Sequence, residues 1–351
     1  MDLELLDRTL ASGGQPPFRA RQVWEWAAKG ATGYEQMTNL PGPLREWLRE
    51  AVPFSSLELQ EERRASDGTV KALLTTVDGR PLEAVLMRYR DRRRSICVSS
   101  QSGCPLTCTF CATGQMKFAR NLTASEILDQ ALHFRRMESI DHCVFMGMGE
   151  PMLNLDNVLA ACERLPDIGV THRRTAISTV GWIPGIERLA QCEMPLRLAL
   201  SLHAADEALR SALMPVNERY PLTDVIEACR AFYERKRRRV FVEYVMLASV
   251  NDRYEQALAL ARLLSPRRTD AEPRVFKVNL IPYNPIGEHP PSPAHSPRVG
   301  VGARDPFRGS TRESIAAFKA ALESRGIQAT VRLTRGRDID AACGQLAARA
   351  A

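Results

Sequence analysis

Three closely spaced cysteines have the residue type and spacing of a metal-cluster loop. Cys104, Cys108 and Cys111 form the pattern C-x3-C-x2-C. Thiolates are soft ligands that suit iron bridged by sulfide, and three of them leave one iron of a [4Fe-4S] cluster without a protein ligand. A structural zinc site takes four ligands, and the chain has no other C-x2-C or H-x3-H pair to complete one. The pattern therefore favours an iron–sulfur cluster with one open iron over zinc.

The other cysteines divide into two groups. Cys97 lies in a predicted strand and Cys343 in a loop flanked by small and polar residues, and either one taken alone would be interpreted as structural. The remaining four lie in apolar strand or helix patterns and are interpreted as core residues: Cys143, Cys162, Cys192 and Cys229. Nine cysteines in a chain of intracellular character indicate metal binding or catalysis rather than a disulfide framework.

Charge and hydropathy limit where in the cell the protein can be located and which partners it can bind. The N-terminal MDLELLDRTLASGG lacks the basic and apolar regions of a signal peptide, and no stretch is apolar over the roughly 18 residues that a membrane span needs, so we expect a cytoplasmic protein without membrane association. The net charge is +7, with arginine runs at Arg88–Arg94 and Arg235–Arg239. Such runs either clamp RNA phosphates or are solvated helix ends.

The elements that position these residues begin with a small N-terminal unit. Residues 16–51 contain two short amphipathic helices separated by a turn-rich stretch, and strand-like runs follow, with hairpin signals at Asp67-Gly68 and Asp78-Gly79. The sequence therefore predicts a small helical domain over residues 1–54 and a β meander over 55–94.

From Ser95 onward, short apolar strands alternate with amphipathic helices. The six strands are SICVSS, HCVFMGMG, RTAISTVG, LRLALSLHA, VFVEYVML and VFKVNLIPY. This alternation predicts an α/β fold with parallel strands in a partial or full barrel, whose chemistry gathers at the carboxyl ends of the strands. Thr123 and Glu126 predict a capping box at the first interstrand helix. The catalytic domain covers 95–351, with a surface loop near 287–310, a helix near 312–324 and a last strand, ATVRLT.

Several segments carry a family resemblance, in the family's order, between about Glu83 and Leu346. They are CVSSQSGCPLTCTFCATGQ, FARNLT, FMGMGEP, STVG, SLHA, LMPVNERYPL, VNLIPYNP and RGRDIDAACGQL. These segments resemble the RlmN family of ribosomal RNA adenine C2 methyltransferases and its relative Cfr, which methylates C8 of the same adenine. FRARQVWEW resembles the family's small RNA-binding domain. The resemblance implies a partial (βα)6 TIM-like radical S-adenosylmethionine barrel with an N-terminal helical domain and a β extension.

The resemblance also implies roles for individual residues. Cys104, Cys108 and Cys111 would bind the cluster. Cys343 would be the S-methylated cysteine, Cys97 its resolving partner in a transient disulfide, and Glu83 the proton acceptor, although the segment from Glu83 to Cys97 is one residue longer than in the RlmN form. Positions that contact S-adenosylmethionine are matched by Gly149, Glu150, Ser178, Ser201, Leu202, His203 and Asn284.

The implied chemistry explains why two extra cysteines are needed. C2 of adenine is electron-poor and its hydrogen is not acidic. C2 therefore cannot act as a polar nucleophile toward the methyl group of S-adenosylmethionine. One S-adenosylmethionine methylates Cys343, and a second yields a radical that activates that methyl group for addition to C2. Glu83 then removes the C2 proton, and Cys97 attacks the Cys343 sulfur and releases the RNA.

The implied partners are 23S rRNA, an adenosine of the tRNA anticodon loop and an electron donor such as flavodoxin, with the enzyme acting as a monomer. Three alternatives stay open. One is Cfr-type methylation at C8, which gives antibiotic resistance. Another is a zinc-containing RNA-binding protein without catalysis. A third is a radical enzyme that acts on protein or small molecules. Without the family match, His203 would be interpreted as a core histidine and Glu83 as an exposed strand carboxylate.

Overall fold

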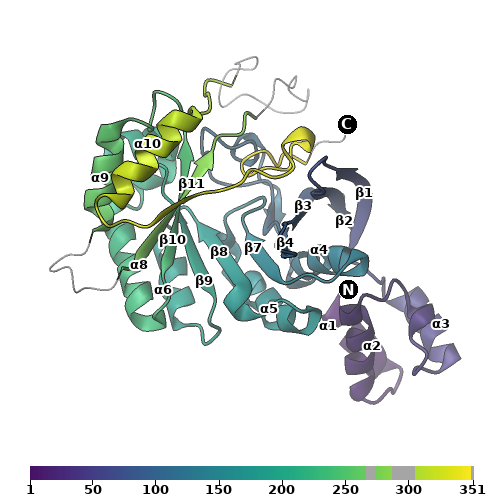
Figure 1. Cartoon of the computed structure of the whole chain (residues 1–351). Helices are drawn as coiled ribbons and strands as arrows, with labels where there is room; N and C mark the ends of the chain where they lie inside the picture. Colours follow the sequence, from purple (N-terminus) through teal and green to yellow (C-terminus); the bar gives the residue numbers. More distant parts are fainter. Residues whose placement is uncertain (266–273, 287–304, 349–351) are drawn as a thin grey trace.

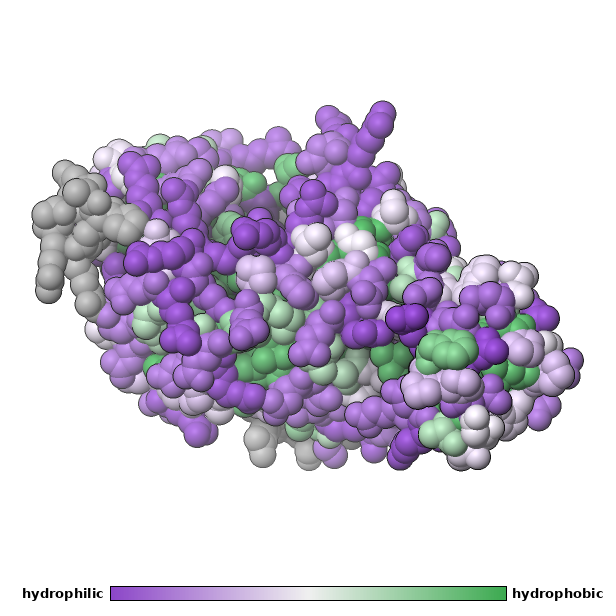
Figure 2. Space-filling view, turned by 90° about the horizontal axis from the view of Figure 1, so that it is seen from below, coloured by the Kyte–Doolittle hydropathy of each residue, from purple (hydrophilic) through white to green (hydrophobic). Residues whose placement is uncertain are grey.

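The computed structural model describes residues 1–265, 274–286 and 305–348. Most of the loop predicted near 287–310 lies outside these residues. Within the described chain, no helix is both long and apolar enough to cross a membrane. Figure 2 shows hydrophilic side chains over most of the face seen from below, with smaller apolar areas between them.

Three helices form the N-terminal unit (Figure 1). They are α1 (Leu3–Ser12), α2 (Phe18–Lys29) and α3 (Gly42–Ala51), with a 3-10 turn, η1, at Tyr34–Gln36. The sequence predicted α2 and α3. It did not predict α1, where the Asp2 side chain caps the helix by accepting from the Leu5 N–H, and where Leu6 and Leu10 are buried.

The N-terminal unit packs on the barrel through one face of α2. Trp24 is buried and its indole N–H donates to Asp167 Oδ2 at 2.7 Å. The Arg164 guanidinium lies over the same ring, 4.7 Å from its centroid. Gly30 ends α2 at φ +101°, so close to the Arg135 carbonyl that a Cβ there would lie 3.1 Å from its oxygen. These contacts fix the unit against α4 (Ala124–Met137) and against the 3-10 turn η4 (Leu165–Ile168), which follows α5 (Leu155–Arg164).

One sheet of ten strands runs through the rest of the molecule, in the order β1-β2-β3-β4-β7-β8-β9-β10-β11-β12. The meander is antiparallel: β1 (Leu57–Arg64), β2 (Val70–Thr76) and β3 (Pro81–Arg88), with β4 (Arg94–Cys97) antiparallel to β3. The strands from β4 onward are parallel. They are β7 (His142–Phe145), β8 (Thr175–Thr179), β9 (Arg197–Ser201), β10 (Val240–Met246), β11 (Phe276–Pro282) and β12 (Ala329–Val331).

Helices cover the outside of the parallel strands (Figure 1). Neighbouring pairs are α4 (Ala124–Met137) with α5 (Leu155–Arg164), α6 (Ile183–Gln191) with α8 (Leu222–Lys236), and α9 (Tyr254–Leu264) with α10 (Arg312–Glu323). The short helix α7 spans Glu207–Leu213, and a small ladder joins β5 (Gln101–Ser102) to β6 (Arg120–Asn121). All six predicted barrel strands are present and parallel, β12 adds the predicted last strand, and the Thr123–Glu126 capping box is confirmed.

Candidate active site

The cluster loop follows β5 and is held by distant segments. The Thr109 N–H donates to the Leu213 carbonyl at 3.0 Å, and the Ala112 N–H donates to the Gly344 carbonyl at 2.8 Å. The Thr113 hydroxyl donates to the Leu346 carbonyl at 2.6 Å. Because Gly344 and Leu346 follow Cys343 closely in the chain, these bonds place the C-terminal segment, residues 332–348, directly against the cluster loop.

The three cysteines of the loop fit a positively charged iron–sulfur group. Burial raises the pKa of the Cys104 thiol to about 12, and burial followed by the charges of Cys111 and Cys104 raises the pKa of Cys108. Burial also raises the pKa of Cys111. All three side chains are half-buried, and three thiolates gathered in one loop need bound cations. Among the described residues, no three His, Cys, Asp or Glu side chains converge as ligands of a single ion. Cluster thiolates instead bind separate irons.

Gly149 and Glu150 follow β7 and lie beside Gln101 of β5. Gly149 has φ +94°, and a Cβ there would lie 2.5 Å from Gln101 Cβ, so this position requires glycine. The Glu150 side chain is buried and accepts from the Met152 and Val180 N–H groups at 3.1 and 3.0 Å. Burial raises the pKa of Glu150 to about 7. Each oxygen keeps acceptor capacity, so an ammonium group would find a binding partner here.

The ends of β8 and β9 bring the next predicted residues together. The Ser178 and Ser201 hydroxyls lie 3.2 Å apart. Leu202 is fully buried, and its N–H donates to the Glu243 carbonyl at 3.0 Å. His203 adopts φ +60°, and its Nδ1 accepts from the Val245 N–H at 3.0 Å, which places the ring proton on Nε2.

Phe110 and His203 link the cluster loop to the barrel. Their rings meet edge to face with centroids 4.7 Å apart. Burial, and then the nearby Arg210 charge, lower the pKa of His203 to about 3. The imidazole is therefore neutral at physiological pH. The structure thus gives His203 a structural hydrogen bond and an aromatic contact, as well as its place at the end of β9.

Asn284 lies beyond β11 beside the C-terminal segment. Its amide N–H donates to the Cys343 carbonyl at 3.4 Å, while its Oδ1 is buried and has no hydrogen-bond partner among the described residues. A buried carbonyl oxygen without a donor is costly. This oxygen is therefore ready to accept a hydrogen bond from a bound molecule.

Arg210 is a site residue that the sequence analysis missed. The guanidinium is fully buried and donates to the carbonyls of Val180 and Leu202 and to the Asn217 side chain. Burial lowers its pKa to about 10, which leaves it charged at neutral pH. It joins the ends of β8 and β9 behind the cluster loop. In the sequence, only the motif LMPVNERYPL, which contains the Arg210 partner Asn217, indicated that the region around Arg210 belongs to the site.

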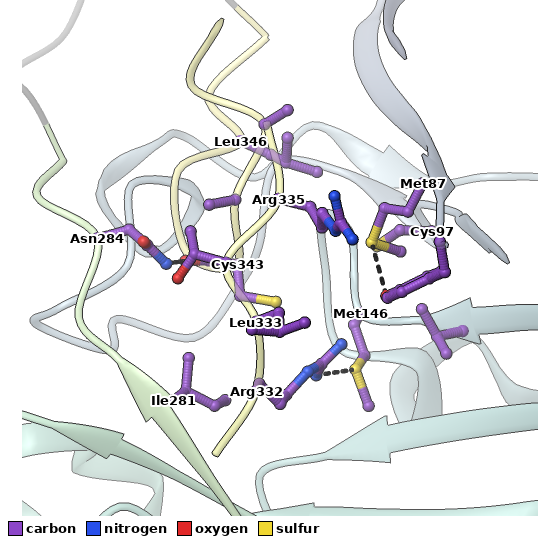
Figure 3. A pocket seen from close by; sticks show the side chains of 15 residues that line it. Met87, Cys97, Met146, Ile281, Asn284, Arg332, Leu333, Arg335, Cys343 and Leu346 are labelled. Carbon is purple, nitrogen blue, oxygen red and sulfur yellow. Dashed lines mark hydrogen bonds between the residues drawn. The ribbon is translucent and has the colours of Figure 1, made fainter. Parts of the chain in front are cut away.

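Cys97 and Cys343 line one cavity (Figure 3). Cys97 ends β4, and Cys343 lies in the C-terminal segment with its sulfur pointing into the cavity. The cavity volume is about 30 Å³. Burial, and next the proximity of Cys343, raise the pKa of Cys97 to about 12. The structure therefore brings together the two cysteines that the family resemblance paired.

Arg332 is the second site residue that the sequence analysis missed. Its guanidinium lies at the cavity, 3.3 Å from Met146 Sδ and 3.3 Å from Glu243 Oε2 (Figure 3). Cys343 is the main cause that raises the pKa of Arg332, and Cys97 adds to it. A cation in this position stabilises a thiolate on either cysteine. Its segment, ATVRLT, signalled only a strand.

Glu83 is buried, not exposed, and it holds the C-terminal segment. Its Oε1 lies 2.9 Å from Lys71 Nζ, and its Oε2 accepts from the Ala347 and Ala348 N–H groups at 2.8 and 3.1 Å. In the β3–β4 ladder Cys97 lies opposite Val85. Because side chains alternate along a strand, Glu83 points to the same sheet face as Cys97, about 7 Å along the strand. It does not line the Cys97–Cys343 cavity.

The four cysteines interpreted as core residues lie in the apolar interior or at its margin. Cys143, Cys162 and Cys229 are buried, and Cys192 is half-buried and packs against the same core. None of the four lines the cavity of Cys97 and Cys343. Substitutions of these cysteines are therefore suitable controls for substitutions of Cys97 and Cys343.

Comparisons with known proteins agree with this arrangement. The radical SAM superfamily profile matches residues 98–261, and the profile of the ribosomal RNA large subunit methyltransferase N-terminal domain matches residues 1–53. A radical SAM methyltransferase from Sphaerobacter thermophilus superposes with a TM-score of 0.87 at 41% identity, covering 99% of this chain and 98% of that one. HydG, a maturase of the [FeFe]-hydrogenase, shares the fold alone, at a TM-score of 0.51 and 11% identity over 68% of this chain and 50% of its own.

Curated relatives match over almost the full length. The chain is 42% identical to the dual-specificity RNA methyltransferase RlmN of Anaeromyxobacter sp. (strain Fw109-5), covering 99% of this chain and 89% of the relative. It is 44% identical to the probable dual-specificity RNA methyltransferase RlmN of Chloroflexus aurantiacus, covering 99% and 92%. With both domain profiles in place, the chain belongs to the RlmN family of radical SAM RNA methyltransferases.

Proposed function

We propose that this enzyme methylates C2 of an adenosine in 23S rRNA at the peptidyl-transferase centre, and of an adenosine in the tRNA anticodon loop, through S-methylated Cys343. The observation that carries the proposal is the cavity that Cys97 and Cys343 share beside the cluster loop. The two cysteines come from β4 and from the C-terminal segment, and a purely structural role for either would not require this meeting.

Cys343 is the acceptor of the first methyl group. Its thiolate electron pair forms the new sulfur–carbon bond, the methyl group leaves the sulfonium of S-adenosylmethionine, and S-adenosylhomocysteine departs. The Arg332 guanidinium beside the cavity stabilises the thiolate before the bond forms. The methyl donor would be held by Glu150 through its ammonium group, with Gly149, Ser178, Ser201, Leu202, His203 and Asn284 around it.

Cys104, Cys108 and Cys111 would hold the [4Fe-4S] cluster, which together with S-adenosylmethionine supplies, when bound, a radical able to activate the methyl group on Cys343. The protein positions that methyl group against the cluster loop through the hydrogen bonds of the Ala112 N–H and the Thr113 hydroxyl. A purine is far larger than the present cavity of about 30 Å³, so the RNA base reaches Cys343 only after the surrounding side chains shift.

Cys97 and Glu83 carry out the release of the product. The Cys97 thiolate attacks the Cys343 sulfur and a disulfide forms. The sulfur–carbon bond to the RNA-linked methylene breaks with its electron pair going to carbon, and that carbon takes a proton from solvent to become the methyl group. Glu83 would accept the C2 proton. In the present structure its carboxylate is occupied by Lys71 and by two backbone N–H groups, so this step requires the C-terminal segment to release it.

The test combines two cysteine variants with mass mapping of the RNA. With reconstituted enzyme, S-adenosylmethionine and reductant, we expect the wild type to yield 2-methyladenine in 23S rRNA. Cys343→Ala should yield none, whereas Cys97→Ala should accumulate a covalent protein–RNA adduct because the resolving thiol is missing. Cys192→Ala, a half-buried cysteine outside the cavity, is the control and should keep wild-type activity.

Other outcomes would overturn the proposal in distinct ways. If the product is 8-methyladenine, the Cfr-type assignment replaces C2. If the protein is colourless and holds one zinc and no iron, the radical mechanism is wrong. If Cys343→Ala retains activity, a radical reaction on another substrate replaces RNA methylation.

We further propose that the enzyme acts as a monomer in the cytoplasm with an electron donor such as flavodoxin. Sedimentation with and without that donor tests these points.

A further inference from the structure

The second arginine run joins cations from two other parts of the chain. Arg235 and Lys236 end α8, and Arg239 immediately precedes β10. Since β8, β9 and β10 are neighbouring parallel strands, their starting ends lie at one edge of the sheet. Arg238 donates to the Arg173 carbonyl at 3.3 Å across this edge. The basic cluster, as we name it, comprises Arg173, Arg174, Arg197, Arg235, Lys236, Arg238 and Arg239.

The basic cluster is held by neutral acceptors. Lys236 Nζ donates to the Met194 carbonyl at 3.3 Å, and Arg239 donates to the Gln328 side chain at 2.8 Å. Arg238 Nε is buried without a hydrogen-bond partner. Within the described part of the chain, no member of the cluster forms an ion pair with a carboxylate. The Glu193 carboxylate acts on Lys236, but more weakly than burial does.

The cations of the basic cluster repel one another. Burial first, and then the Arg174 charge, lower the pKa of Arg197. Burial, and then the charges of Arg197 and Arg173, lower the pKa of Arg238. Like charges gathered without counter-charges destabilise the fold. An anion bound at this edge would relieve the repulsion.

The first arginine run, Arg88–Arg94, differs although its composition is similar. Arg88 and Arg94 both pair with Glu138. Arg93 stacks on the Tyr89 ring, 4.0 Å from its centroid. Glu138 therefore offsets charge in this run, whereas within the part of the chain that the structure describes no member of the basic cluster forms an ion pair with a carboxylate. The structure thus separates two runs that the sequence could not distinguish.

We propose that the basic cluster binds the phosphate backbone of the substrate RNA at the sheet edge opposite the catalytic edge. The proposal rests on the proposed RNA substrate and extends it to a second point of contact. Ser201 and Arg197 are the last and first residues of β9, four residue steps or roughly 13 Å apart along the strand. An RNA must therefore extend beyond the target loop to contact the basic cluster while that loop lies at the catalytic edge. Arginine side chains bind the phosphates of RNA without reading its base sequence.

The test measures RNA binding by the reconstituted holoenzyme across a salt series, with two RNAs: a whole 23S rRNA transcript and a short hairpin that carries only the target loop. The variant replaces four exposed members of the cluster, so the fold should be retained: Arg173→Gln, Arg174→Gln, Arg235→Gln and Arg239→Gln. The control keeps the charge at the same four positions: Arg173→Lys, Arg174→Lys, Arg235→Lys and Arg239→Lys.

We expect the cluster variant to bind the long transcript at least about tenfold more weakly at low salt, and to lower the slope of log K against log salt by roughly 2 to 4. Binding of the hairpin, and kcat at saturating RNA, should not change. Equal slopes for variant and wild type, or equal losses in variant and control, would overturn this inference alone. A wild type that binds neither RNA would instead overturn the proposed function.

Discussion

Glu150 has a pH dependence that can be measured. Burial raises its pKa to about 7, so the side chain is mostly protonated at pH 6 and mostly ionised at pH 8. An ammonium group beside it is therefore bound roughly tenfold more tightly at pH 8. Calorimetry of S-adenosylmethionine binding to the cluster-loaded enzyme should show this change. Glu150→Gln should flatten it, and an equally steep profile in that variant would contradict the assignment.

The same shift has a consequence for stability. The folded pKa lies above the ordinary value of 4.5, so the folded state binds the proton more tightly than the unfolded chain does. Glu150 therefore favours the folded state at low pH, and this contribution is lost as pH rises from about 4.5 to 7.

Residue types and spacing predicted the chemistry at single positions but not their partners. The cluster cysteines could be recognised because three thiols in C-x3-C-x2-C have few other uses. Arg210 and Arg332 were missed because nothing in their local sequence distinguishes them from solvated arginines. Their significance comes from contacts between distant segments, such as Arg332 with Met146.

At the scale of elements, the turn after β7 depends on one glycine. Gly149→Ala would combine a left-handed backbone with a Cβ 2.5 Å from Gln101 Cβ, whereas Gly79→Ala adds a Cβ at φ +73° with no atom within 4 Å. We expect Gly149→Ala to cost about 1–3 kcal/mol more than Gly79→Ala in denaturant unfolding. It should also weaken S-adenosylmethionine binding. Equal costs would show that the Gln101 contact is easily relieved.

The barrel elements were predictable because each strand is a short apolar run between amphipathic helices. The six parallel strands and the capping box of α4 follow from that local rhythm. Helix α1 was missed although it is as long as α3. Much of its stability comes from burying Leu6 and Leu10 against its neighbours, and such tertiary contacts are not visible in the local sequence. The burial of Glu83 was hidden because its partners lie on β2 and at the C-terminus.

At the scale of the whole molecule, Trp24 joins the N-terminal unit to the barrel. Trp24→Phe removes the hydrogen bond to Asp167 but keeps an aromatic ring. Hydrogen bonds to charged groups contribute about 1.5–3 kcal/mol, so we expect unfolding to become easier by this order. Limited proteolysis should cut sooner between the unit and β1. Trp26→Phe, which loses a bond to Asn39 within the unit, is the control and should leave the cutting rate unchanged.

The residues that follow Cys343 are held to the cluster loop and to Glu83 through main-chain groups. The Gly344 and Leu346 carbonyls and the Ala347 and Ala348 N–H groups make these bonds. Gln345 is the exception, since its side chain donates to the Pro285 carbonyl at 2.8 Å. Main-chain groups are the same whatever the side chain. A side-chain substitution at Ala347 should therefore leave these bonds, and with them the position of Cys343, in place.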